Sequence, residues 1–410
     1  MKPDGAHSPH LTYCTNIHPG ESWAQVRANF DRYVLPIREQ LAPDRPFGLG
    51  LRLSAEAARE LAAEDTLAEF RTFLDRHRLY VFTLNGFPYG PFHGQPVKEE
   101  VYLPNWMQPE RLAYTDELAS LLETLLPDGV DGTISTVPGA FAPLVAGGAD
   151  VQRMAEQMAR HAAHLHRIHE RSGRHIALAL EPEPCCYLET VAETVAFFQE
   201  ELFGPRAVAT LREEIGGSAG EAERLLREHL TVCFDACHMA VEFEEPGAAL
   251  AAFESAGIRI GKYQISAGLR LRFSGDAAAD AELRRALEEF ADPVYLHQVV
   301  ERGADGRLRR FLDLPEALRA AARDTSAREW RIHFHVPLFR EELGPFQSTQ
   351  PYLKDLIGQL ADGPGGAHWE VETYTWDVLP PEFRGEGVVT AVVRELRWVL
   401  EQMGSRSSDE

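Results

Sequence analysis

Short apolar runs with strand-like composition alternate with helix-like segments along almost the whole chain. The alternation predicts nine strands, at residues 11–17, 47–53, 80–86, 132–137, 176–181, 231–236, 258–265, 330–336 and 369–375. Clear helical patterns follow at Ala55–Ala63, Asp116–Leu126, Val151–Arg171, Leu188–Leu202 and Ala248–Ala256. Such alternation is typical of parallel sheets with right-handed crossovers. We therefore expect an α/β fold, with one (β/α)8 TIM-barrel domain over residues 11–402. A doubly wound open sheet is the alternative, but no strand leads into the GxGxxG loop of a nucleotide-cofactor site.

The surplus strand falls late in the chain, between about residues 258 and 340. The same region contains a predicted hairpin, Val294–Glu301 with Leu308–Leu312, around the turn sequence Gly-Ala-Asp-Gly. We interpret residues 270–328 as an insertion after the seventh barrel strand. Whether 258–265 or 330–336 is that strand stays open. The ends, 1–10 and 404–410, are expected to be disordered.

The run Ile176–Pro184 is an apolar strand that ends on a carboxylate. Side chains alternate along a strand, so Ala177, Ala179 and Glu181 share one face. Pro182 has no N–H for strand pairing, so the strand ends there and Glu181 lies at its mouth. Catalytic groups of TIM barrels lie at the carboxyl ends of the strands. Glu181 is therefore a candidate metal ligand or acid/base group.

The sixth predicted strand ends in a second polar pair. Asp235 shares a face with Thr231 and Cys233, and His238 follows three residues later, where the chain turns away. An acid and an imidazole at this spacing can meet one metal ion or one substrate hydroxyl. The alternative is an Asp that caps a helix and a histidine at the surface.

Two histidines alternate in the segment Arg331–Pro337, which places His333 and His335 on one strand face. Imidazoles at this spacing converge well on a metal ion, and His335 lies nearer the mouth. A pair of buried, hydrogen-bonded histidines is the alternative interpretation.

The last predicted strand aligns Glu370, Glu372 and Tyr374 on one face, with Glu372 across the mouth from Glu181. Glu370 would lie one layer deeper, where an unpaired carboxylate is costly. On the strand Lys262–Ser266, Lys262 and Gln264 share a face at comparable depth. We therefore predict a contact between Lys262 and Glu370 inside the barrel.

Further candidates lie in the first half of the chain. Asn16, His18, Arg52 and Asn85 stand at the ends of early strands, where they would contact a polyhydroxylated or anionic substrate, or only hydrogen-bond the strand ends. The long loop from 85 to 106 is rich in Gly, Pro and aromatic residues, and we predict that it forms a lid. Its ring-bearing residues include Tyr89, Phe92 and His93.

The net charge and composition of the chain limit the kinds of molecule that it can bind and the compartment in which it is expected. The 410 residues carry 63 acidic and 41 basic side chains, a net charge of −22, which opposes binding to nucleic acid. No apolar run approaches the roughly 20 residues that span a bilayer, and the first residues lack the pattern of a secretion signal. Five cysteines without a Cys-x-x-Cys pair indicate a reducing cytoplasm.

Four motifs resemble those of the xylose-isomerase-like TIM barrels, which include sugar isomerases, keto-sugar epimerases and endonuclease-IV-type enzymes. They are Glu-Pro-Glu-Pro at 181–184, Asp-x-x-His at 235–238, His-x-His at 333–335 and Glu372. In xylose isomerases the first motif carries a metal-binding glutamate and a catalytic lysine. Glu183 stands at the lysine position here, which opposes a hydride shift of the xylose-isomerase type.

The resemblance implies one divalent ion, Mn, Zn, Fe or Mg, bound by Glu181, Asp235, His335 and Glu372, with Gln264 as an additional candidate. Glu181 and Glu372 would exchange a proton as base and acid, while His238 and Arg52 would orient substrate oxygens. No nucleotide cofactor is expected. Asn16, His18, Asn85 and His333 are the remaining candidates for contact with the substrate.

Five segments also resemble a family of metabolite-traffic proteins linked to secondary-metabolite precursors, at residues 13–21, 180–184, 234–238, 263–266 and 372–380. The resemblance implies a metal-dependent, isomerase- or epimerase-like protein for a small sugar or cyclitol. A binding protein that keeps the site without turnover is the second hypothesis. An endonuclease-IV-like repair enzyme is a remote third, because its multi-metal site needs more histidines on the early strands.

Overall fold

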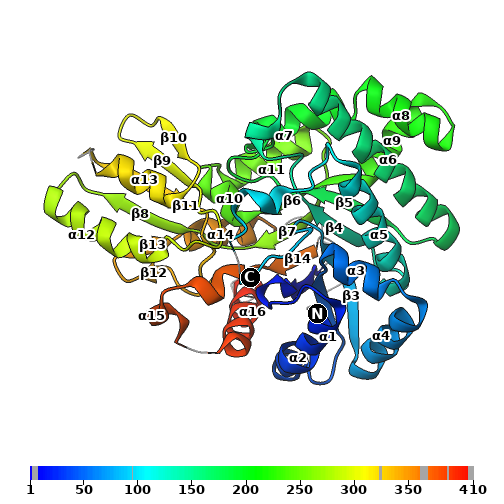
Figure 1. Cartoon of the computed structure of the whole chain (residues 1–410), viewed down its shortest axis with the longest axis horizontal. Coiled ribbons are helices and arrows are strands. Elements are labelled where there is room, and N and C mark those ends of the chain that lie inside the picture. The colour runs from blue at the N-terminus through cyan, green and yellow to red at the C-terminus, as the bar shows by residue number, and fades with distance from the viewer. Residues whose placement is uncertain (2–7, 95, 323–325, 361–367, 386, 405–410) are drawn as a thin grey trace.

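Eight parallel strands form a nearly closed barrel in the computed structural model (Figure 1). The structure describes residues 1, 8–94, 96–322, 326–360, 368–385 and 387–404. The barrel strands are β1 (His10–Tyr13), β2 (Phe47–Arg52), β3 (Leu79–Asn85), β4 (Gly132–Thr136), β5 (Ile176–Leu180), β6 (Leu230–Asp235), β7 (Ile260–Ile265) and β14 (His368–Val371). Their order is β1-β14-β7-β6-β5-β4-β3-β2, and a bridge between Cys14 and Gly50 brings the two ends together. The predicted TIM barrel is confirmed.

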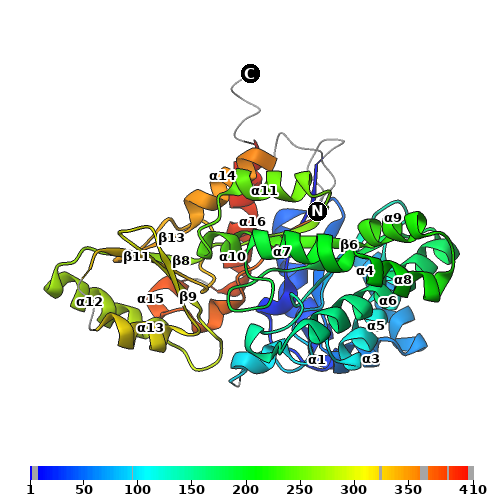
Figure 2. The ribbon, with the colours of Figure 1, turned by 90° about the horizontal axis from the view of Figure 1, so that it is seen from above.

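Helices surround the strands on the outside of the barrel (Figures 1 and 2). They are α1 (Trp23–Asn29), α2 (Leu35–Leu41), α3 (Ala55–Leu61), α4 (Glu64–His77), α5 (Pro109–Leu125), α6 (Gly148–Ser172), α7 (Val191–Phe197), α8 (Pro205–Ile215), α9 (Ala219–His229), α10 (Ala236–Val241), α11 (Pro246–Ser255), α14 (Gln350–Leu360) and α16 (Val388–Gly404). The short helix α15 (Pro381–Arg384) lies apart from them, where the ring of Phe383 packs 5.9 Å from that of Phe290, centroid to centroid. Local sequence sets several ends: Ser22 and Gln25 form a capping box at α1, and Gly173 ends α6 at φ 72°. Among the helices described, none has the length and apolarity needed to cross a membrane.

A second sheet interrupts the barrel between β7 and β14. It contains six antiparallel strands in the order β10-β9-β11-β8-β13-β12. They are β8 (Leu269–Phe273), β9 (Val299–Gly303), β10 (Leu308–Phe311), β11 (Arg328–Ile332), β12 (Glu342–Leu343) and β13 (Phe346–Ser348), accompanied by α12 (Ala277–Leu287) and α13 (Leu314–Ala321). This unit projects from one side of the barrel (Figures 1 and 2). The seventh barrel strand is therefore β7, and the candidate at 330–336 belongs in part to the second sheet.

Several predicted boundaries are wrong. The first strand ends at Tyr13, and Thr15–Ile17 forms a 3-10 turn instead of continuing it. The last strand ends at Val371, so Glu372 and Tyr374 follow the strand instead of sharing its face. His10 already belongs to β1, and α16 reaches Gly404, although both residues were placed in disordered ends. Residues 1, 8 and 9 of those ends are also described, whereas 2–7 and 405–410 lie outside the described residues.

The interior of the barrel contains an ion pair between Lys262 on β7 and Glu370 on β14. Lys262 Nζ lies 2.7 Å from Glu370 Oε2, and neither side chain has any exposed surface. The predicted contact is confirmed. The carboxylate occupies space left by Gly50, where an added Cβ would lie 1.7 Å from Glu370 Oε1. Pairing of the two charges offsets part of the cost of burying either one alone.

Candidate metal and substrate site

A pocket lies at the carboxyl ends of the barrel strands. Its polar lining includes Asn16, Asn85, Glu181, Glu183, His238, His333 and Glu372, and its apolar lining includes Phe87, Phe92, Val97, Tyr102, Tyr295, Leu296 and Tyr374. Six residues predicted to act at the site therefore meet in one cavity. Asp235, His335 and Gln264 are fully buried and do not line it.

Glu181 comes directly after β5. Its backbone N–H donates to the carbonyl of Thr136 at 3.1 Å, which fixes the residue at the end of β4. Its Oε2 has no hydrogen-bond partner among the described residues. Burial raises the pKa of Glu181 well above its usual range, and the nearby Glu372 and Asp235 raise it further. The carboxyl group thus favours either a proton or a neighbouring cation.

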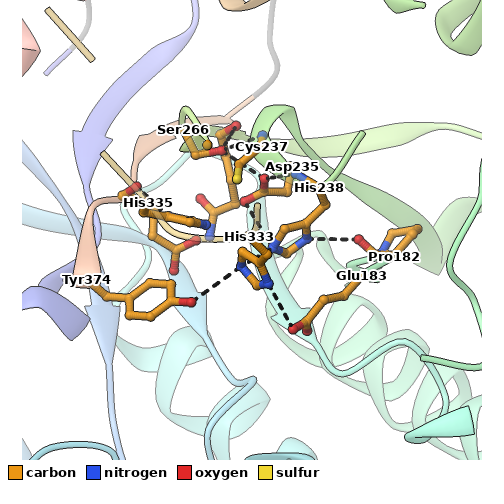
Figure 3. Close-up of polar contacts among 12 residues, drawn as sticks. Pro182, Glu183, Asp235, Cys237, His238, Ser266, His333, His335 and Tyr374 are labelled. Carbon is orange, nitrogen blue, oxygen red and sulfur yellow. Dashed lines mark hydrogen bonds and ion pairs between the residues drawn. The ribbon is translucent and has the colours of Figure 1, made fainter. Parts of the chain in front are cut away.

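Asp235 both caps a helix and points into the site. Its Oδ1 accepts hydrogen bonds from the backbone N–H of His238 at 2.9 Å and from Ser266 Oγ at 2.8 Å (Figure 3). Its Oδ2 has no partner within the described chain and lies 3.9 Å from His238 Nε2. Asp235 therefore caps the helix, as the alternative interpretation predicted, but its Oδ2 remains available to a ligand. Burial raises the pKa of Asp235.

His238 is held by a single backbone contact. Its Nδ1 lies 2.9 Å from the carbonyl oxygen of Pro182, and its Nε2 lies 3.1 Å from Nε2 of His333 (Figure 3). Burial lowers the pKa of His238 to about 3, so the ring is neutral at pH 7. It is not a surface histidine.

His333 and His335 lie on the segment that leaves the second sheet. β11 ends at Ile332, whose carbonyl accepts from the N–H of Phe334 at 2.8 Å, so the histidines lie beyond the strand on which they were predicted. His335 Nδ1 lies 2.8 Å from the backbone oxygen of Glu372. Its Nε2 has no partner in the part of the chain that the structure describes. Burial lowers the pKa of His335 to about 4.

Two asparagines hold Glu372. Its Oε1 accepts from Asn16 Nδ2 at 2.7 Å and from Asn85 Nδ2 at 3.2 Å. Burial raises the pKa of Glu372 well above its usual range, with further contributions from the charges of Asp235 and Glu370. The predicted substrate contacts Asn16 and Asn85 thus line the pocket, and the amide nitrogen of each donates to Glu372.

The acceptor groups gather closely enough to hold a metal ion. One ligand atom from each residue lies within 4.8 Å of the others in three sets: His238, His333 and His335; Glu181, Asp235 and His238; Asp235, Cys237 and His335. Glu372 belongs to none of the sets found among the described residues. Both amide atoms of Gln264 lack partners there, so Gln264 can also face a ligand. Buried carboxylates and neutral imidazoles without donors fit a cation.

Arg52 and His18 do not line this pocket. Arg52 donates to the carbonyl of Gly20 and to Glu21 Oε2, and its Nη2 donates to the carbonyl of Gly90 at 2.6 Å. His18 is buried against Tyr13 Oη at 3.0 Å. Both side chains stabilise loops at the barrel mouth, and neither meets the candidate ligands.

Glu183 belongs to a hydrogen-bond network that the sequence only partly predicted. Glu183 Oε1 accepts from Tyr102 Oη at 2.7 Å and from Gln298 Nε2 at 3.2 Å. Burial raises the pKa of Glu183 to about 8, against the opposing effect of these hydrogen bonds. The unusual Glu-Pro-Glu-Pro sequence pointed to Glu183. Nothing in the pattern indicated Tyr102 or Gln298.

The described residues of loop 85–106 cover the pocket together with the second-sheet unit. The ring of Phe92 lies 5.2 Å from that of Tyr295 and 5.4 Å from that of Tyr374, centroid to centroid. Lys98 Nζ lies 2.7 Å from Asp313 Oδ2 and donates to the carbonyl of Tyr295 at 2.6 Å. The loop is therefore fastened to the insertion.

The barrel is similar to solved structures across nearly its full length. A xylose isomerase-like TIM barrel protein from Mycobacterium smegmatis, solved in complex with magnesium, is 13% identical, with a TM-score of 0.50 over 98% of this chain and 99% of that one. Two others are the probable 3-DHS dehydratase AsbF from Bacillus anthracis (12% identity, TM-score 0.47, 96% and 98% covered) and the IOLI protein with a bound zinc atom (12%, 0.46, 97% and 98%). The first likeness shows the xylose-isomerase-like TIM-barrel fold. No family model and no curated protein sequence matches the chain.

Proposed function

We propose that the protein is a divalent-metal-dependent enzyme of the sugar isomerase or epimerase kind. One observation carries the proposal: Glu181 Oε2, Asp235 Oδ2 and His335 Nε2 are buried at the barrel mouth without a donor among the described residues. These three residues would hold the ion, with Glu372 and Gln264 as further candidates. The magnesium in the Mycobacterium smegmatis structure accords with a divalent ion here.

A bound ion would bind neighbouring substrate oxygens and acidify the adjacent proton. Glu181 and Glu372 would exchange that proton as base and acid, because burial gives both carboxyl groups a raised pKa. Asn16 and Asn85 orient Glu372 by its Oε1. Glu183 stands where the resemblance to xylose isomerases places a lysine, so the proposed reaction needs no lysine-assisted hydride shift.

The substrate we propose is a small polyhydroxylated metabolite, such as a sugar or cyclitol. The resemblance to the metabolite-traffic protein EboE supports a role in making or moving a secondary-metabolite precursor in the cytoplasm. A binding protein without turnover is the second candidate, and Glu183 in place of lysine favours it. The net charge of −22 opposes a nucleic-acid substrate.

Metal analysis of the purified protein, combined with Glu181→Gln and Glu372→Gln, tests the proposal. We expect about one divalent ion per chain, and a roughly 10- to 100-fold weaker affinity in Glu181→Gln. Asp128→Asn, at a carboxylate that is 99% exposed, is the control. If the protein holds no stoichiometric metal and neither glutamine variant alters metabolite binding, the proposal fails. Binding without turnover of any polyol would favour the second candidate.

Removal of the ion should also lower stability. A ligand at 100 times its dissociation constant stabilises the folded state by about 2.7 kcal/mol, so chelation should reduce the melting temperature. Re-addition of the ion should restore it. An unchanged melting temperature after complete chelation would contradict a metal bound only by the folded chain.

A further inference from the structure

Three buried histidines turn their rings toward one another beneath the lid. His238, His333 and His335 come from α10 and from the segment after β11, and one ring nitrogen of each lies within 4.8 Å of the others. Their exposed fractions are 5%, 3% and 0%. The Nε2 atoms of His238 and His333 are only 3.1 Å apart (Figure 3). Which nitrogen of each ring carries the proton therefore decides what can lie between them.

Backbone carbonyls fix the proton on two of the rings. Nδ1 of His238 faces the carbonyl oxygen of Pro182 at 2.9 Å, and Nδ1 of His335 faces that of Glu372 at 2.8 Å. A carbonyl oxygen only accepts, so each Nδ1 must donate. In these neutral rings each Nε2 then carries no proton and presents a lone pair.

The proton of His333 is fixed through Gln298. The Gln298 Nε2 atom donates to Tyr102 Oη at 2.9 Å and to the carbonyl oxygen of Pro184 at 3.2 Å, which orients the amide. Its Oε1 therefore accepts from His333 Nδ1, at 2.8 Å. The Nε2 of His333 is thus a lone pair as well, and the hydroxyl of Tyr374 lies 3.3 Å from it.

The Nε2 lone pairs of the three histidines consequently face one buried space. The only hydroxyl donor described near them is that of Tyr374. Tyr374 can donate to His333, but His238 Nε2 meets only another lone pair, and His335 Nε2 has no partner among the described residues. Asp235 Oδ2 adds a fourth acceptor, 3.9 Å from His238 Nε2. Such an arrangement is repulsive without a cation and favourable with one.

We propose that the divalent ion is bound in a nitrogen-rich site by His238, His333 and His335. Asp235 and Glu181, whose ligand atoms lie within 4.8 Å of one another and of one in His238, supply the oxygen ligands. The inference rests on the proposed function and deepens it, because it assigns His238 and His333 to the metal instead of to the substrate. Imidazole ligands suit Zn²⁺, Fe²⁺ and other transition ions, whereas Mg²⁺ prefers oxygen ligands. The site therefore selects a transition ion over Mg²⁺.

X-ray absorption at the zinc edge of the zinc-loaded full chain tests the ligand set directly, because imidazole rings give multiple-scattering features that oxygen ligands lack. We expect three imidazoles per zinc. Competition by a thousandfold excess of Mg²⁺ should not displace the zinc. These two measurements use the unaltered protein, so they do not depend on whether a variant folds.

His238→Asn and His333→Asn should each weaken zinc binding at least tenfold, measured against a competing chelator, while retaining a wild-type circular dichroism spectrum. His164→Asn, at a half-buried histidine on α6, is the control and should leave affinity unchanged.

A single imidazole in a shell of oxygens, or displacement of zinc by Mg²⁺, would overturn the nitrogen-rich site and leave the proposed function standing. A chain that binds no stoichiometric metal would overturn both. A proton shared between His238 and His333 in place of metal would appear as an imidazolium nitrogen shift in NMR, and would also refute the inference.

Discussion

At the scale of residues, the barrel interior follows from the cost of burying charge. Side-chain alternation placed Glu370 deep in the barrel, and the same rule placed Lys262 at its level, so the ion pair could be predicted before the fold was known. Burial alone would lower the pKa of Lys262, but the adjacent Glu370 carboxylate outweighs it and raises that pKa. The pair is therefore charged and mutually dependent.

Lys262→Met should destabilise the protein by about 3–5 kcal/mol, because it leaves the Glu370 carboxylate buried and alone. The double variant Lys262→Met with Glu370→Leu should recover most of this loss. Urea unfolding measures both. Removal of the exposed partner in the pair Arg224–Glu228 should cost less than about 0.5 kcal/mol and serves as the control. Equal losses for the single and double variants would contradict a coupled pair.

Gly50→Ala should destabilise the fold by roughly 1–3 kcal/mol, because the new Cβ would overlap the Glu370 carboxylate and force it away from Lys262. Gly220→Ala, on α9 where the space around the glycine is open, should be neutral or stabilising by up to about 1 kcal/mol. Thermal melting of the two variants checks the contrast. A wild-type melting temperature for Gly50→Ala would show that the carboxylate has room to move.

Residues that act through irregular loops could not be predicted. Glu181 and Asp235 stand where strands end, so local patterns placed them. Gln298 and Tyr102 contact Glu183 only because the insertion folds back over loop 85–106. No periodicity in either segment encodes that contact, since it depends on the positions of two units that are distant in sequence.

At the scale of elements, the strand boundaries explain the main discrepancy. The alternation Arg-Ile-His-Phe-His-Val is typical of one continuous strand, but pairing stops at Ile332 and the chain turns toward the barrel. Hydrogen-bond partners, which a single sequence does not reveal, decide where a strand ends. The two histidines still reach the site because the turn leads them there.

Helix α16 positions two parts of the site through Glu395. Its Oε1 accepts from Thr373 Oγ1 at 2.7 Å and from the backbone N–H of Leu338 at 3.2 Å. Thr373 follows Glu372 directly, and Leu338 is three residues after His335. One buried carboxyl group on an outer helix thus fastens both segments that carry candidate ligands.

This contact predicts a pH dependence. Burial raises the pKa of Glu395 to about 7 from an ordinary value of 4.5. Between these values the folded chain holds a proton that the unfolded chain releases, so the free energy of unfolding falls as pH rises, by on the order of 3 kcal/mol in total. Glu395→Gln keeps the acceptor oxygen but cannot ionise, so its stability should decline less than that of wild type from pH 5 to 7. Parallel pH profiles of unfolding would refute the assignment.

The lid should loosen when its fastening is removed. Lys98→Ala deletes the ion pair with Asp313 and the hydrogen bond to Tyr295, a loss of about 1–2 kcal/mol. Backbone amides of residues 87–94 and 96–102 should then exchange roughly tenfold faster with deuterium. Lys354→Ala, which removes an exposed ion pair with Glu341, should leave the exchange of these amides unchanged. Equal exchange in both variants would place the restraint on the lid elsewhere.

At the scale of the whole molecule, the second sheet is part of the site's construction. The insertion between β7 and β14 supplies Tyr295 and His333 to the pocket lining, and His335 to the group of histidines beside the pocket. The surplus of predicted strands indicated that an insertion exists. That its exit segment would bring histidines to the site required the three-dimensional arrangement of both units.

The position of the short strand β14 in the sequence determines when the barrel can close during synthesis. It contributes only His368–Val371, yet it lies between β7 and β1. A chain emerging from the ribosome therefore carries seven barrel strands with two bare edges until residue 371 has been made, and bare edges pair readily with other chains. The entire second sheet precedes β14 and is free to fold during that interval. Glu372 is the next residue to emerge, and Tyr374 follows two residues later, so the last residues that line the pocket are made directly after the strand that closes the barrel.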